Sequence, residues 1–246
     1  MLSLNASDPR AVALIAAIQT GDVDSLRAQL RDEPALAGAT ILDSQGAKRS
    51  TLHIAADWPG HFPNVAPIIE TLVRAGADVN ARFECPNPDS AGETPLHWAA
   101  SSDDVACLLA LLKGGANIEA TGAVFTGGTP MSDAVVFAQW RAAACLLEHG
   151  ATTTLWQAAA LGLLDRVREL CPDRSAADRP QITNALWHAA RGGQQPAAEY
   201  LLDLGADLNW VGYDRRTALD AALERGESPL TGSLRARGGR RAVELA

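Results

Sequence analysis

The chain has 246 residues and a formal net charge of −8 at pH 7, with 47% hydrophobic and 20% charged residues. This composition is typical of a folded chain rather than a disordered one. The acidic balance argues against a general nucleic-acid binder, because such proteins displace counterions with clustered Lys and Arg. No apolar run approaches the roughly 20 residues that span a bilayer, and no basic-then-apolar leader opens the sequence, so we expect neither a membrane segment nor a secretory signal.

The cysteines favour a reducing compartment. Cys85, Cys107, Cys145 and Cys171 show no pair with metal-site spacing. Cys107 and Cys145 each stand just before a Leu-Leu pair, which is typical of small buried thiols. We therefore expect no metal, no cofactor and a cytoplasmic location.

A phrase of six or seven residues returns along the chain. Residues 50–56 read Ser-Thr-Leu-His-Ile-Ala-Ala, residues 94–100 read Thr-Pro-Leu-His-Trp-Ala-Ala, and residues 185–190 read Ala-Leu-Trp-His-Ala-Ala. Threonine favours a helix start, and proline is tolerated in the first turn. A Gly-Ala pair follows each phrase, where a second helix must end with positive φ; the glycines are Gly76, Gly115 and Gly205.

This phrase, two short helices and the Gly-Ala-Asp turn resemble the ankyrin repeat, whose period is about 33 residues. The resemblance implies an all-α fold, an α-solenoid of stacked helix-turn-helix units with short hairpin-like loops. About six to seven units are expected. The leucine position of each phrase marks these units. It is occupied by Leu14, Leu52, Leu96, Met131, Leu155, Leu186 and Leu219. Richness in Ala, Arg and Gly favours a bacterial type of array from a GC-rich genome.

We predict a single ankyrin-repeat domain over residues 1–246. Residues 8–40 form an N-terminal cap unit, because they lack the Thr-Pro start and the histidine. Residues 45–231 hold the repeats, and residues 232–246 form a basic, flexible tail.

The interval from Leu52 to Leu96 is too long for one repeat, so it requires insertions near residues 58–64 and 83–93. The first insertion raises the question of an Asp57–His61 pair. Such a pair could orient an imidazole for proton transfer, whereas the alternative is that both residues satisfy the loop backbone.

The resemblance gives each position of the phrase a role. His53 and His97 match the family histidine that bonds loop backbone between units. Trp156 and Trp187 replace that histidine, and we expect bulky apolar packing there. The residue that follows this histidine position shares one helix face with the residues three and four positions further along. In ankyrin arrays this face lines the concave groove.

We predict that this groove binds a partner or ligand through Asp57, Trp58, His61, Trp98, Ser101, Ser102, Asp133, Phe137, Gln157, His188 and Arg191, and that the loop tips contribute Trp210 and Tyr213. Some of these positions have structural alternatives. Trp98 could fill space between helices. Residues 101–104 could cap a helix that begins near Val105, or contact a partner with their acidic groups.

The function that we predict is a protein–protein interaction module, which binds a cytoplasmic partner through its concave groove and loop tips. The alternative is a small-molecule-binding protein or enzyme, with a groove pocket made of Asp57, His61, Trp98, Asp133, Gln157 and His188. A third hypothesis is a structural array whose basic tail is the contact surface. The sequence contains no nucleophile elbow, phosphate loop or His-Glu-x-x-His pair, which disfavours an enzyme.

Overall fold

The computed structural model describes residues 2–87, 92–173, 175 and 178–245. The chain forms two compact units, Met1–Thr152 and Thr153–Ala246, which we call unit 1 and unit 2. Each is described by itself. The single domain over residues 1–246 stays a prediction, and part of the insertion predicted at 83–93 lies outside the described residues.

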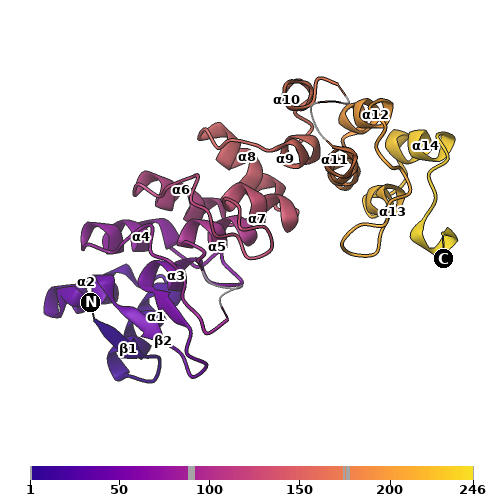
Figure 1. Cartoon of the computed structure of the whole chain (residues 1–246). Helices are drawn as coiled ribbons and strands as arrows, with labels where there is room; N and C mark the ends of the chain where they lie inside the picture. Colours follow the sequence, from indigo (N-terminus) through magenta and orange to yellow (C-terminus); the bar gives the residue numbers. More distant parts are fainter. Residues whose placement is uncertain (1, 88–91, 174, 176–177, 246) are drawn as a thin grey trace. The chain divides into compact units, whose positions relative to one another are not determined.

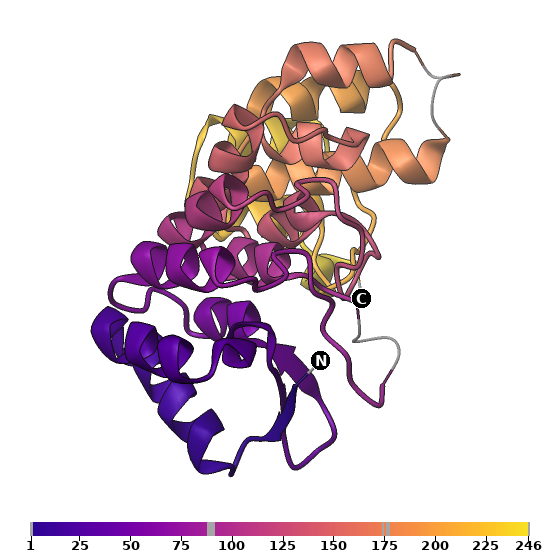
Figure 2. The ribbon, with the colours of Figure 1, turned by 90° about the vertical axis from the view of Figure 1, so that its left-hand side faces the viewer.

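The described part of unit 1 contains four helical hairpins that follow one another along the chain (Figures 1 and 2). The first helices of successive hairpins pack against one another, and so do the second helices. The helices are α1 (Pro9–Thr20), α2 (Val23–Asp32), α3 (Thr51–Ala56), α4 (Val65–Arg74), α5 (Pro95–Ser101), α6 (Val105–Lys113), α7 (Pro130–Val136) and α8 (Trp140–Glu148).

A small sheet near the N-terminal end of unit 1 was not predicted. Its strands are β1 (Ser3–Asn5), β2 (Thr40–Leu42) and β3 (Lys48–Ser50), in that order, and a 3₁₀-helix, η1 (Pro34–Gly38), precedes β2. The β1–β2 pair is parallel and the β2–β3 pair is antiparallel. Strands of three residues are too short for an alternating apolar pattern to reveal them.

Unit 2 contains three hairpins within its described residues. Its helices are α9 (Leu155–Ala160), α10 (Leu164–Leu170), α11 (Arg179–Gly192), α12 (Gln195–Asp203), α13 (Ala218–Leu223) and α14 (Pro229–Ala236), followed by a 3₁₀-helix, η3 (Ala242–Glu244). The first helices α9, α11 and α13 pack in succession, and α10 packs on α12. The seven hairpins found among the described residues of the two units agree with the number of repeats that the marker positions predict.

The tail predicted from residue 232 begins inside α14, so the last hairpin extends to Ala236. Leu230 and Leu234 bury this helix in the core of unit 2. The segment that follows is bonded to α13, because the Thr217 hydroxyl donates to the carbonyl of Arg240 at 2.8 Å and the Asp220 carboxylate accepts from the backbone N–H of Ala242 at 2.7 Å. Where we predicted a flexible tail, the chain is therefore attached by specific hydrogen bonds.

The core positions follow the repeated phrase. Six of its seven marker residues are at most 2% exposed, namely Leu14, Leu52, Leu96, Met131, Leu186 and Leu219. Burial of each such side chain contributes about 1.5–3 kcal/mol. Gly76, Gly115 and Gly205 adopt φ between 94° and 98°, as the predicted helix ends require. Among the described helices, none is long and apolar enough to cross a membrane.

Candidate functional site

Two buried histidines connect successive hairpins of unit 1, as the resemblance implied. His53 Nε2 lies 3.1 Å from the carbonyl of Glu93, and His97 Nε2 lies 3.3 Å from the carbonyl of Gly128. Each Nδ1 accepts from the backbone N–H of the helix cap, Ser50 or Thr94. Burial lowers the pKa of both imidazoles to about 4, so both are neutral at pH 7 and serve structure.

The side chain of Trp98, which follows His97 on α5, is held in a fixed position. Its indole meets the His53 ring edge-on, with centroids 4.8 Å apart, and the Phe83 ring at 5.2 Å. Its Nε1–H donates to Glu93 Oε2 at 2.8 Å, while Glu93 Oε1 accepts from the backbone N–H of Val124 at 3.1 Å. The aromatic contacts and the charge-assisted hydrogen bond therefore fix both Trp98 and the Glu93 carboxylate.

A hollow of about 200 Å³ opens beside Trp98, and we call it the Trp58 hollow. Its lining consists of Ala56, Asp57, Trp58, Glu93, Trp98, Ser101, Ser102, Val124 and Phe137. It therefore brings together six of the predicted groove residues. Trp58 is 83% exposed and Phe137 40% exposed, and the Phe137 ring contacts the exposed Phe125 at 5.8 Å.

Three carboxyl groups lie in or beneath this hollow. Asp57 forms an ion pair with Arg49 at 2.7 Å, and burial raises its pKa despite that partner. Burial also raises the pKa of Glu93. Asp133 is 1% exposed, and its burial together with the nearby charge of Glu93 raises its pKa to about 8. A side-chain hydrogen bond joins Asp133 and Glu93, and with its pKa raised to about 8 the Asp133 carboxyl is the one that holds the proton at pH 7.

His61, in contrast, is not paired with Asp57. Its backbone N–H donates to Asp104 Oδ2 at 2.5 Å, and its ring Nε2 lies 3.1 Å from the carbonyl of Ser102. The hydrogen bonds therefore favour the alternative to an Asp57–His61 pair: Asp104 and the loop backbone satisfy His61, and Asp57 Oδ1 accepts from the backbone N–H of Trp58 at 3.0 Å. Asp104 also caps α6 by accepting from the backbone N–H of Cys107 at 3.0 Å, which confirms the predicted cap.

The groove positions predicted in the middle of the array are buried. Asp133 and Gln157 are at most 2% exposed, and His188 is 6% exposed. Gln157 Oε1 accepts from the backbone N–H of Thr154 at 2.7 Å, the role that His97 has in α5. The alternative pocket also divides between the units: Asp57, His61, Trp98 and Asp133 belong to unit 1, and Gln157 and His188 to unit 2.

In α11, the expectation that Trp187 replaces the histidine bond by apolar packing is wrong. Trp187 makes the inter-repeat hydrogen bond itself, because its Nε1–H donates to the carbonyl of Arg216 at 3.0 Å. His188 packs against Trp156 and Trp187, with centroids at 4.6 and 5.0 Å. Burial lowers the pKa of His188 to about 3, and its Nδ1 has no partner among the described residues. The guanidinium of Arg191 lies 5.8 Å from the Trp187 ring.

The predicted loop-tip aromatics meet in unit 2. The Trp210 and Tyr213 rings are 5.7 Å apart at 85°, and Tyr213 is 77% exposed. They line a hollow of about 430 Å³ at the start of α11, where the Asn184 amide donates to the Tyr213 hydroxyl at 3.4 Å. This arrangement is a second candidate contact surface, within unit 2.

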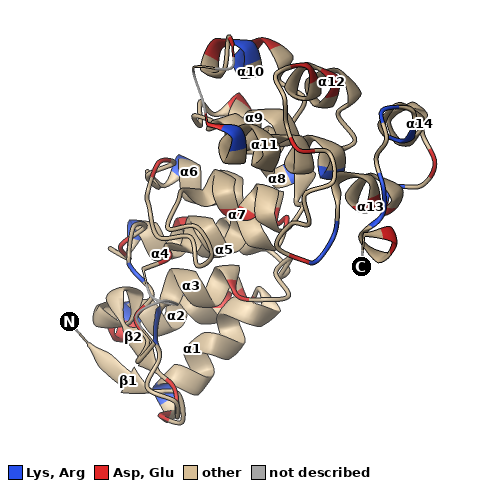
Figure 3. Ribbon diagram, turned by 45° about the vertical axis from the view of Figure 1, so that its right-hand side comes forward, with Lys and Arg blue, Asp and Glu red and all other residues tan. Residues whose placement is uncertain are grey.

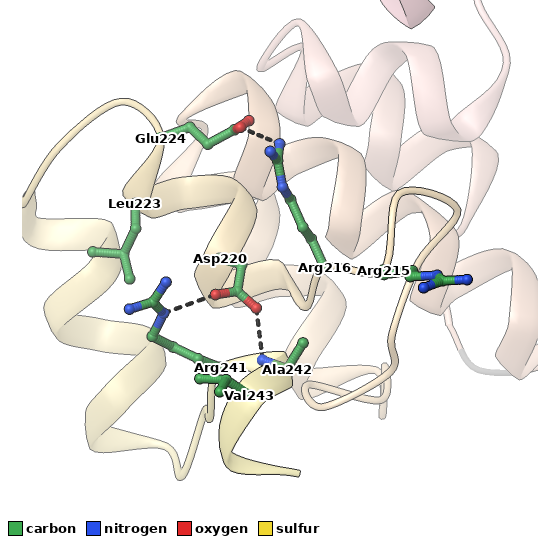
Figure 4. A pocket seen from close by; sticks show the side chains of 8 residues that line it. All are labelled: Arg215, Arg216, Asp220, Leu223, Glu224, Arg241, Ala242 and Val243. Atoms are coloured by element: carbon green, nitrogen blue, oxygen red, sulfur yellow. Dashed lines mark hydrogen bonds and ion pairs between the residues drawn. The ribbon is translucent and has the colours of Figure 1, made fainter. Parts of the chain in front are cut away.

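A third hollow, of about 450 Å³, lies beside α13 and η3 (Figure 4). The Arg216 and Arg241 side chains form ion pairs with Glu224 and Asp220, while the Arg215 side chain points away from them. These ion pairs neutralise the positive charges of Arg216 and Arg241 that a basic contact surface would need. Figure 3 likewise shows basic and acidic positions interspersed along the helices and loops of each unit.

The described residues contain no cluster of three His, Cys, Asp or Glu side chains that could hold a metal ion. Sequence reasoning missed Glu93, which fixes Trp98, and Phe83, which packs on it. A signal for Glu93 was present, since it directly precedes the Thr-Pro start of the best-matching phrase.

Comparison with known proteins agrees with this architecture. The ankyrin repeat family model matches residues 48–83 and 91–123. The ankyrin repeat and KH domain-containing protein of Caenorhabditis briggsae is 28% identical over 184 residues, which are 75% of this chain. The RelA-associated inhibitor of Mus musculus is 51% identical over 55 residues, or 22% of this chain. The aligned segment spans only 6% of the length of each relative.

Among solved structures, the human ASB11 ankyrin repeat domain resembles the chain with a TM-score of 0.53 and 22% identity. The alignment covers 92% of this chain and 98% of that one, which supports the fold over nearly the whole length. Stacked hairpins, inter-repeat histidines and these matches all agree: the chain is an ankyrin-repeat protein.

Proposed function

We propose that this chain is a protein-interaction module that binds a segment of a partner protein at the Trp58 hollow of unit 1. The observation that carries the proposal is Trp58 itself, 83% exposed at the rim of a hollow whose other wall, Trp98, is already fixed. Ankyrin repeats are generally protein–protein interaction modules. Tryptophan is enriched among the few residues that contribute most of the energy of such interfaces.

The size of the hollow supports a peptide side chain over a metabolite. At about 200 Å³ it is smaller than the roughly 300–1,000 Å³ typical of small-molecule sites. An anchor side chain inserted there would meet Trp58 and Trp98, while the rest of the segment contacts the rim near Phe137 and Phe125. Trp210 and Tyr213 in unit 2 are the second surface that we propose for partner contact.

We place this activity in the cytoplasm. The support is chemical: Cys107, Cys145 and Cys171 are buried, free thiols, and burial raises the pKa of each. Protonated thiols without disulfide partners suit a reducing compartment.

The test begins with a displayed random-peptide library selected on the full chain, so that no partner has to be known. Affinities of the selected peptides are then measured for the wild type, for Trp58→Ala and for Leu109→Ala. Leu109 is an exposed apolar residue on the second helix α6 and serves as the matched control. We expect Trp58→Ala to weaken binding at least about tenfold, or 1.4 kcal/mol.

Two results would overturn the proposal. Peptides that bind Trp58→Ala as tightly as the wild type would exclude this hollow. A loss caused by Tyr213→Ala instead would move the site to the loop tips of unit 2.

A further inference from the structure

We infer that the Trp58 hollow takes a positively charged side chain, arginine or lysine, of the bound segment. The inference rests on the proposed function and deepens it, because it names the chemistry of the anchor residue. It follows from the walls of the hollow, its carboxylates and the absence of a basic group among its described lining residues.

The walls are aromatic and presented by separate loops and helices. Trp58 follows α3, Trp98 lies on α5, and Phe137 ends α7. A guanidinium or ammonium group over such faces is attracted by the ring quadrupole, most strongly for tryptophan. Arginine gains further from stacking of its planar guanidinium.

Carboxylates supply the charge complement. Asp57 at the rim is already paired with Arg49, which leaves Glu93 as the acidic group for a ligand. The Trp98 indole donates to one Glu93 oxygen and the Val124 backbone N–H to the other, and Glu93 is also hydrogen-bonded to Asp133. A carboxylate has about four lone-pair sites, so one acceptor site on the fixed Glu93 carboxylate is left for a donor in the hollow.

Other occupants fit less well. None of the described lining residues is Lys or Arg, so an anionic side chain would face Glu93 without a counter-charge. An apolar side chain would remove water from the Glu93 carboxylate and give it no hydrogen bond in return. A cationic group alone combines aromatic attraction, hydrogen bonding and charge neutralisation at this place.

Asp133 adds an independent indication. It lies beneath Glu93, is 1% exposed, and its Oδ2 has no hydrogen-bond partner among the described residues. Two neighbouring carboxyl groups therefore lie at this side of the hollow, and none of its described lining residues is Lys or Arg. A cation beside Glu93 compensates the negative charge of this pair.

The experiment titrates the full chain with three small probes, ethylguanidinium, n-butylammonium and n-butanol, and follows the tryptophan indole N–H resonances by proton–nitrogen NMR. The Trp98 indole is a direct reporter, because its N–H is bonded to Glu93. We expect saturable shifts of the Trp98 and Trp58 resonances with the two cations and none with the neutral alcohol.

Glu93→Gln should lower the affinity for ethylguanidinium at least about tenfold, while keeping an acceptor for the Trp98 indole. The matched control is Glu119→Gln, a half-exposed carboxylate of unit 1 that accepts from the backbone N–H of Thr152 at 2.6 Å, outside the hollow. We expect the control to bind ethylguanidinium like the wild type.

Equal shifts with n-butanol and the cations, or a Glu93→Gln variant that binds ethylguanidinium like the wild type, would overturn the inference. If the selected peptides need Trp58 yet contain no essential Arg or Lys, the cationic anchor is wrong and the proposed function stands. If cations shift the Trp98 resonance but no selected peptide needs Trp58, the hollow binds cations without binding a partner segment. Both the proposed function and the cationic anchor of a partner are then wrong.

Discussion

The two units use the same pair of residues in opposite order. In α5 of unit 1 the sequence is His97-Trp98, and in α11 of unit 2 it is Trp187-His188. The first residue of each pair makes the bond between hairpins, His97 to the carbonyl of Gly128 and Trp187 to the carbonyl of Arg216. The second residue differs, because Trp98 lines a hollow whereas His188 is buried between tryptophans.

The comparison shows that position, more than residue type, decides structural role in these repeats. In both helices the first position carries a ring N–H donor, which imidazole and indole both provide. The second position differs between the two helices: in α5 it carries an aromatic wall bonded to a carboxylate, while in α11 it carries a neutral imidazole within the core.

The largest effect is expected where the indole replaces the imidazole. Trp187→Ala removes a side chain that is only 5% exposed and should lower the free energy of unfolding by about 3–5 kcal/mol. Trp187→Phe keeps most of the ring but loses the donor to Arg216, so its cost should be about 1–3 kcal/mol. Urea unfolding followed by circular dichroism measures both.

Trp210→Phe is the control for this pair, since Trp210 is partly exposed in the same unit. A Trp187→Phe variant as stable as the wild type would show that packing alone holds α11 to the next hairpin, which is what the sequence predicts.

His97 offers the corresponding test in unit 1. His97→Leu loses both the cap to Thr94 and the bond to Gly128, which should cost about 2–3 kcal/mol. His97→Gln should cost only about 1 kcal/mol, because a glutamine at the equivalent cap position, Gln157, accepts from the backbone N–H of Thr154. Equal losses for the two variants would contradict the roles assigned to the ring nitrogens, namely the helix cap at Nδ1 and the bond to the next hairpin at Nε2.

The units should also differ in their response to pH. His53, His97 and His188 have pKa values lowered to about 4, 4 and 3, so the unfolded chain binds more protons and stability is lost as pH falls from about 6.5 to about 4. Asp133 acts in the opposite direction. Its pKa is raised to about 8, so the folded chain binds more protons and stability is lost as pH rises toward about 8.

We therefore expect a maximum of stability near pH 6.5, with an alkaline decline that belongs to unit 1. Asp133→Asn should abolish the decline between about pH 6.5 and pH 8, while the loss on the acid side remains. Urea midpoints across this range measure it. A wild type whose midpoint does not fall between pH 6.5 and pH 8 would mean that Asp133 is ionised in the folded chain.

Much of the fold could be predicted because the repeated phrase encodes it locally. The leucine markers, the glycine turns and the histidine bonds all follow from residue type at a fixed spacing. The site was predicted only in part. Trp58, Trp98 and Phe137 follow from the phrase, but Glu93 enters through a hydrogen bond to Trp98, and sequence order does not reveal that contact.

The errors have a common physical cause. Asp133, Gln157 and His188 are polar, and we predicted that they line the binding groove. Short first helices rich in alanine let neighbouring hairpins approach closely, so this face is buried at all three positions, and Gln157 and His188 bond to backbone or pack on rings. How close two hairpins come depends on both of them, and a single phrase does not encode it.

The smallest effect on stability is expected at the proposed anchor. Trp58 is 83% exposed, so Trp58→Ala should change the free energy of unfolding by no more than about 0.5 kcal/mol. Trp187→Ala should lower the free energy of unfolding several times more, because Trp187 is buried, although both substitutions delete an indole. Urea unfolding of Trp58→Ala beside the wild type measures this contrast. A contact residue should contribute little to folding and much to peptide binding, as expected of an exposed tryptophan. A fall in the free energy of unfolding above about 2 kcal/mol would instead assign Trp58 to the core and remove the main support for the hollow as a binding site.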